Sequence, residues 1–168
     1  MVQSVVPLEL INPRSTLYPI MGRPLFHVGA AHVRVAEFDE TEEKIYGLDR
    51  VDYGQRIYVV EGPIDSLFLP NAIAVSGSSF DTPTIRKLLS NATIVMDNEP
   101  RNKQIVSNIR KTISLGRKVC IWPDTIHQKD INDMVLHGKT INMIMDTINT
   151  NTFQGMAAKL RFTEWRKC

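Results

Sequence analysis

The pattern of hydrophobic and polar positions changes near residue 50 of the chain. Beyond that point, short unbroken runs of apolar, often β-branched residues alternate with segments whose apolar residues recur every three or four positions. Unbroken runs of this length are typical of strands buried on both faces, and the spaced pattern is typical of helices with one buried face. The sequence therefore predicts strands at 57–60, 72–75, 93–96 and 118–122.

Helices are predicted between and after these strands. One covers 64–69, a second starts at Asp81-Thr82-Pro83 and buries residues 85, 88 and 89, and two more lie around 131–136 and 141–148. A longer helix opens at Pro100, repeats isoleucine at 105, 109 and 113, and ends near Gly116. This alternation of strands and helices predicts an α/β fold with a mostly parallel sheet flanked by helices.

The first 50 residues have a different texture, rich in proline and glycine. Short stretches of β-favouring residues at 17–18, 24–28 and 32–38 read as strands joined by turns. We therefore expect three parts: a small β-rich segment at 1–50, the α/β domain at 51–150, and a basic tail or docking helix at 151–168.

Composition excludes several classes of protein. With 43% hydrophobic and 23% charged residues over 168 positions, the chain can build a core, which excludes wholesale disorder. The two cysteines form no CxxC pair and the four histidines are scattered, so neither a disulfide framework nor a zinc site is expected. No apolar run approaches a membrane span, and the first residues do not resemble a signal peptide. We expect a soluble protein of the reducing cytoplasm.

Carboxylates follow the predicted strands. Glu61 comes directly after the first strand, Asp97 follows the third with Glu99 two residues on, and Asp65 lies one helical turn beyond Glu61. Two further acids, Asp130 and Asp133, follow the fourth strand. The carboxyl ends of parallel strands share one edge, so these acids should converge there and bind Mg²⁺ or Mn²⁺. The alternative is that they are turn formers or helix caps, an interpretation we prefer for Asp81 and Asp124.

Basic residues are concentrated in two places. Residues 101–118 contain six bases and no acid, and the last ten residues place four bases around Trp165. A solvated helix face is the usual outcome for such a stretch. Salt-sensitive binding of single-stranded nucleic acid is the alternative. The segment around Trp165 could stack on bases, although docking against the sheet is the interpretation we favour.

Four motifs in this order and spacing resemble a known family. They are KIYGLD at 44–49, VEGPID at 60–65, MDNE at 96–99 and KDIND at 129–133. The second and third resemble a Toprim domain, and the set is similar to the DnaG-related DNA primases of large tailed phages. Residues 14–31 resemble the small β-rich segment that precedes Toprim in these primases. The resemblance covers roughly residues 10–168.

The resemblance implies a Toprim fold and metal-dependent ribonucleotidyl transfer that makes RNA primers on single-stranded DNA during replication. It implies a catalytic group of Glu61, Asp65, Asp97 and Glu99. The implied ligands of Mg²⁺ or Mn²⁺ are Glu61, Asp97, Glu99, Asp130 and Asp133. The expected contacts to nucleotide or nucleic acid are Arg101, Lys103, Arg110, Lys111 and Lys129.

Partners are implied as well: a single-stranded DNA template, ribonucleoside triphosphates and a replicative helicase, with no membrane, in the host cytoplasm if the chain is phage-encoded. Such primases begin with a zinc ribbon that this sequence lacks, so the chain resembles their C-terminal catalytic half. Two alternatives are open. One is another Toprim enzyme, a nuclease or topoisomerase, although the tyrosines at 18, 46, 53 and 58 are interpreted as strand packing rather than as a nucleophile. The other is a non-catalytic half that binds template or helicase.

Overall fold

The computed structural model of the protein describes residues 43–75, 80–88 and 90–168. The strands predicted at 17–18, 24–28 and 32–38, and with them most of the β-rich segment, lie outside the described residues, as do Tyr18 and Leu89. The β-rich segment and the domain boundaries therefore stay predictions.

A single five-stranded sheet organises the described part of the chain. Its strands are β1 (Ile57–Val60), β2 (Ala72–Ala74), β3 (Ala92–Val95), β4 (Lys118–Cys120) and β5 (Thr152–Phe153), in the spatial order β2-β1-β3-β4-β5. The first four are parallel, as predicted, and β5 pairs with β4 in the antiparallel direction. Val59, Ile73, Ile94 and Val119 are fully buried, so both faces of the central strands are covered, as the unbroken apolar runs indicate.

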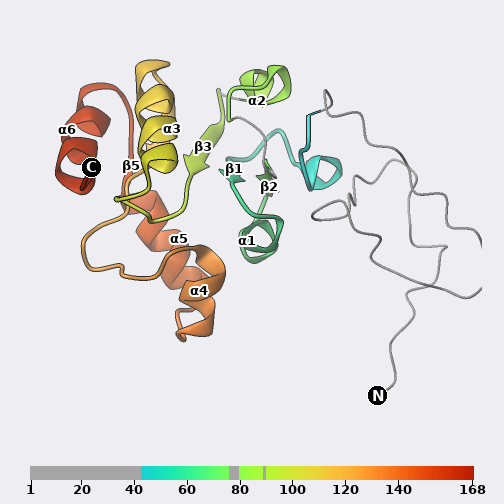
Figure 1. Ribbon diagram of the computed structural model, residues 1–168. Coiled ribbons are helices and arrows are strands. Elements are labelled where there is room, and N and C mark those ends of the chain that lie inside the picture. The colour runs from blue at the N-terminus through green and yellow to red at the C-terminus, as the bar shows by residue number, and fades with distance from the viewer. Residues whose placement is uncertain (1–42, 76–79, 89) are drawn as a thin grey trace, which may run out of the picture.

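Helices cover both sides of the sheet (Figure 1). They are α1 (Pro63–Phe68), α2 (Pro83–Leu88), α3 (Lys103–Ser114), α4 (Ile131–Leu136), α5 (Ile141–Thr150) and α6 (Gly155–Trp165), preceded by the short 3₁₀ helix η3 (Leu48–Arg50). Figure 1 shows α2, α3 and α6 toward one side of the sheet and α1, α4 and α5 toward the other. The mostly parallel α/β fold predicted from the sequence is confirmed.

Local hydrogen bonds set the helix ends. The prediction that α3 opens at Pro100 is wrong, because the Asn102 side chain accepts hydrogen bonds from the N–H groups of Gln104 and Ile105, at 3.0 and 3.4 Å. Helix α3 therefore begins at Lys103. It ends as predicted, with Gly116 just beyond the last turn at φ +69°, in the left-handed region that favours glycine.

The C-terminal segment docks rather than projecting into solvent. Phe162 and Trp165 of α6 are 6% and 5% exposed and stack on each other, with their ring centroids 6.3 Å apart. Tyr58 packs inside β1, as expected, whereas Tyr53 is 63% exposed in a turn, so the strand-packing interpretation is wrong for that residue. Within the described ranges, no helix combines the length and apolar character that crossing a bilayer requires.

Candidate active site

The acidic residues gather at the carboxyl ends of two neighbouring central strands, β1 and β3. Strands β1 and β3 are neighbours, with Val60 opposite Val95, so Glu61 and Asp97 leave the same edge one and two residues later. The crossover from β1 leads to β2 on one side, and the crossover from β3 leads to β4 on the other. The two acids therefore lie at the topological switch point, where open α/β sheets bind ligands.

Helices α1 and α4 add further carboxylates to this edge. Asp65 in the first turn of α1 is 8% exposed, and its Oδ1 accepts a hydrogen bond of 2.8 Å from the N–H of Asn132 in α4. Asp130 caps α4, with its Oδ1 accepting from the N–H of Asp133 at 2.7 Å. Capping thus accounts for part of what Asp130 does, as the alternative interpretation proposed, and it also fixes that carboxylate beside Asp65.

Burial and mutual repulsion change the protonation of these acids. Burial, followed by the charges of Glu61 and Asp65, raises the pKa of Asp97 to about 7. Burial and then the charge of Glu99 raise the pKa of Glu61. The pKa of Asp65 is raised chiefly by burial and also by Asp130, against the hydrogen bond from Asn132. We call the group Glu61, Asp65, Asp97, Glu99 and Asp130 the acidic rim.

Lys129 provides the opposing charge. Its Nζ lies 3.6 Å from Oδ2 of Asp97, and the charges of Asp97 and then Glu99 raise the pKa of the lysine. The ammonium lowers the pKa values of Glu61, Asp65 and Asp97 but does not outweigh their burial. One exposed lysine thus faces several carboxylates that are buried or partly buried, and the rim has an excess of negative charge.

The other predicted site residues are placed differently. Asp133 Oδ1 lies 3.0 Å from His137 Nδ1, and its Oδ2 accepts a hydrogen bond from the Lys129 N–H at 3.2 Å. Its charge is not among those that raise the pKa values of Glu61, Asp65 and Asp97. Lys111 pairs with Asp81 at 3.2 Å rather than with the rim. Lys103 is the exposed first residue of α3, and Arg110 lies further along the same helix.

The basic stretch 101–118 is not one solvated face. Arg117 is 7% exposed and, with Arg86 and Lys111, binds Asp81, so the pKa of that carboxyl is held far below its usual range. Asp81 is therefore the centre of a structural ion-pair cluster, and Thr82 accepts the capping hydrogen bond from Ile85 N–H at 3.3 Å instead.

Asn98, which the sequence analysis did not single out, joins three parts of the site. Its N–H donates to the Lys129 carbonyl at 2.6 Å, and its Nδ2 donates to the carbonyls of Ile126 and Gln128 at 2.9 and 3.2 Å. Its Oδ1 accepts from Nε1 of Trp165 at 3.0 Å. Its position between Asp97 and Glu99 was the feature of the sequence that could have identified it as a site residue. Asn98 holds the loop after β3, the β4–α4 loop and α6 in one arrangement.

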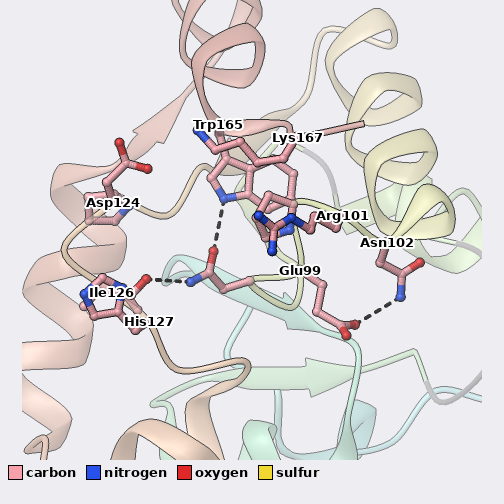
Figure 2. Close-up of a pocket in the computed structure, with 11 residues that line it drawn as sticks. Glu99, Arg101, Asn102, Asp124, Ile126, His127, Trp165 and Lys167 are labelled. Carbon is pink, nitrogen blue, oxygen red and sulfur yellow. Dashed lines mark hydrogen bonds between the residues drawn. The ribbon is translucent and has the colours of Figure 1, made fainter.

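A cavity of about 460 Å³ opens beside this junction (Figure 2). Its walls are residues 98–102, the loop residues 123, 124, 126 and 127, and the C-terminal residues Trp165 and Lys167. Figure 2 shows Arg101 and Glu99 on the same side of the cavity, with Glu99 accepting a hydrogen bond from Asn102. Glu99 thus belongs both to the cavity wall and to the acidic rim, and the two features are neighbours.

The rim has the donor chemistry of a hard divalent cation. All its ligating atoms would be carboxylate oxygens, and Glu61 Oε2 is buried without a hydrogen-bond partner. No group of three or more His, Cys, Asp or Glu side chains among residues 43–75, 80–88 and 90–168 is already arranged to hold a metal ion. Mg²⁺ is commonly held by one or two carboxylates together with substrate phosphates, so a preformed cage is not required.

Gly62, the N-cap residue of α1, leaves room for the Asp65 carboxylate of the acidic rim. A Cβ at this position would lie 2.7 Å from Oδ2 of Asp65, which is buried and held by Asn132. We expect Gly62→Ala to displace Asp65 and to lower the free energy of unfolding by about 1–2 kcal/mol. Urea unfolding measures this, with Gly54→Ala as the control because its added Cβ has 3.2 Å to Asp52 in an exposed turn. Equal stability of the two variants would contradict a close contact at Gly62.

Comparison with known proteins gives one informative similarity. No protein-family model matches the chain. The DNA primase of Enterobacteria phage T4 is 38% identical over 165 residues, which are 97% of this chain and 47% of the phage protein. The chain thus spans about half the length of that relative. It is similar along nearly its whole length to part of a phage DNA primase, which supports a primase-related region.

Proposed function

We propose that the acidic rim is the catalytic centre of a primase-type ribonucleotidyl transferase with the Toprim arrangement, which makes RNA primers on single-stranded DNA. The observation that carries the proposal is the convergence of partly buried carboxylates at the switch point, where burial and then the charges of Glu61 and Asp65 raise the pKa of Asp97 to about 7. The similarity to a phage primase favours this chemistry over that of a nuclease or topoisomerase. A replicative helicase as partner and the host cytoplasm as location belong to the same proposal.

The reaction joins a 3′-hydroxyl to the α-phosphorus of a second nucleotide, with pyrophosphate leaving. Asp97 and Glu99, supported by Asp65 and Asp130, would hold Mg²⁺ or Mn²⁺, which supplies charge neutralisation for the phosphates when bound. Glu61 is our candidate proton acceptor, because its Oε2 has no hydrogen-bond partner and its pKa is raised by burial and by Glu99.

The nucleotide would occupy the cavity beside the rim. At about 460 Å³ the cavity is in the size range of small-molecule sites, and its walls are fixed by the hydrogen bonds of Asn98. Arg101 lines the same cavity as Glu99 and could bind phosphate oxygens there (Figure 2). Lys129, 3.6 Å from Asp97, is our candidate for offsetting the charge of the leaving pyrophosphate.

Dinucleotide synthesis tests the proposal. The chain, with and without a separately supplied zinc-ribbon domain, is incubated with single-stranded template, labelled ribonucleotides and Mg²⁺. We expect a labelled dinucleotide that disappears when EDTA removes the metal. Nicking of the template would indicate a nuclease, and binding without product would indicate a non-catalytic module.

Glu61→Gln tests the proton acceptor within the same assay. Gln keeps the size of the side chain but cannot take up a proton, so we expect dinucleotide yield to fall by about 10²-fold or more while thermal melting is unchanged or slightly improved. Glu164→Gln on the exposed side of α6 is the matched control and should leave the yield unaltered. A yield for Glu61→Gln within a few fold of the unaltered chain would remove Glu61 from the catalytic group.

A further inference from the structure

Helices α3 and α6 enclose a second cavity, separate from the acidic rim. Its volume is about 470 Å³, and three cationic side chains line it: Arg110 from α3, and Lys159 and Arg166 from α6 or its C-terminal cap. Two hydroxyl side chains, Ser114 and Thr163, lie on the same surface. None of the described residues that line this cavity is acidic. We call it the α3–α6 groove.

The cations of the groove differ from their neighbours in what they contact. Lys111 and Arg117 bind Asp81, and Arg161 binds Glu164 at 3.3 Å. The Arg110 guanidinium instead lies 5.9 Å from the ring centroid of Phe162, and no carboxylate of residues 43–75, 80–88 or 90–168 forms an ion pair with it. Within the basic stretch, Lys111 and Arg117 thus belong to the cluster around Asp81, whereas Arg110 joins Lys159 and Arg166 in the groove.

The walls of the groove are rigid. Phe162 is buried between Arg110 and Trp165, and the Arg166 N–H donates to the Phe162 carbonyl at 3.0 Å. Trp165 is in turn tied to Asn98 beside the rim. The helix faces that carry the three cations are therefore in place before any ligand arrives, which lowers the entropy cost of binding a repeating anion.

We propose that the α3–α6 groove binds the phosphate backbone of a single strand of nucleic acid. Three cations and two hydroxyls without an acid match phosphate oxygens, and guanidinium groups bind them in a forked geometry. The groove is concave and small, so it admits one backbone, whereas a duplex presents a convex surface that would touch only its edges. The choice of nucleic acid over other polyanions rests on the proposed function, but the groove shares no side chain with the acidic rim.

The double variant Lys159→Gln/Arg166→Gln tests this inference by fluorescence anisotropy of a labelled thymidine oligonucleotide. The titrations contain EDTA and no nucleoside triphosphate, so they report on binding alone and remain informative if catalysis is never observed. Each neutralised phosphate contact contributes about 0.7 to the slope of log affinity against log salt for a single strand. We expect the double variant to lose about 1.4 from that slope and about tenfold or more in affinity at low salt.

Lys87→Gln on α2 is the control. It removes one positive charge, as each of the two changes in the double variant does, and its exposed side chain lies outside the groove. It should leave the slope unchanged. The inference is overturned if the double variant keeps the affinity and slope of the unaltered chain, or if the unaltered chain does not bind the oligonucleotide at about 20 mM salt. It is also overturned if heparin binds through these residues and the oligonucleotide does not, which would make the groove a site for another polyanion.

Discussion

Replacing Asp97 by Asn is expected to abolish nucleotidyl transfer and, without divalent metal, to stabilise the fold at neutral pH. Loss of the carboxylate removes a ligand oxygen and one anion from the rim, so we expect dinucleotide yield to fall by about 10³-fold or more. The same change removes a partly buried anion, whose burial and repulsion by Glu61 and Asp65 raise the pKa of Asp97 to about 7. Activity and stability should therefore move in opposite directions, which distinguishes a functional acid from a structural one.

The pH dependence of this stability gain has a defined sign. The folded pKa of about 7 lies above the ordinary value of 3.8, so between these values the folded chain retains a proton that the unfolded chain has released. The free energy of unfolding of the unaltered chain therefore falls as the pH rises from 4 to 7. Asn carries no charge, so the variant lacks this loss, and its advantage should grow to about 1–3 kcal/mol at pH 8.

Urea unfolding at pH 4.5 and pH 8, both in EDTA, measures the effect. Asp146→Asn on the exposed face of α5 is the control, and it should show no comparable change between the two conditions. Addition of Mn²⁺ at pH 8 should narrow the gap, because metal bound to the rim stabilises only the unaltered chain. An advantage of the variant over the unaltered chain that is the same at both pH values would show that Asp97 is not under electrostatic strain.

The sequence was sufficient for the parallel part of the sheet because its strands are unbroken apolar runs such as Ile57–Val60. It was not sufficient for β5, which has two half-buried residues and exists only because β4 offers an edge to pair with. The α3 start was misplaced for a different reason. Pro100 and Asn102 both favour a helix start, and the capping hydrogen bonds of Asn102 are as local as the preference of proline for the first turn, so the sequence did not rank the two.

The acids of the site could be predicted because strand ends of a parallel sheet meet at one edge. The ion-pair partners of the basic residues could not be predicted. Nothing in the spacing shows that Arg117 is buried with Asp81 while Arg110 covers Phe162, since both choices depend on which helix packs beside α3. The role of Asn98 was missed on the same grounds. Its partners are 28, 30 and 67 residues away, and an asparagine between two acids looks like a turn residue.

Asn98→Asp is expected to be among the most destabilising isosteric changes in the described part of the chain. The new carboxylate could still accept from Trp165, but it loses the two Nδ2 donations and would face the carbonyl oxygens of Ile126 and Gln128. It would also add an anion next to Asp97, where burial and repulsion already oppose ionisation. The expected loss in the free energy of unfolding is about 3 kcal/mol at pH 8.

The matched control is Asn102→Asp, four residues along the same loop and exposed. It adds the same charge and replaces the exposed donation to Glu99 by a like charge, but aspartate caps a helix as well as asparagine and favours the helix N-terminus, so its cost should stay within about 1–2 kcal/mol. The new carboxyl at position 98 should have a raised pKa, so protonation on acidification restores one donor, and the loss should shrink at pH 4.5. Thermal and urea unfolding at both pH values measure this, together with the near-ultraviolet signal of Trp165. Two variants of equal stability, or a loss at position 98 independent of pH, would show that Asn98 does not hold the two loops and α6 together.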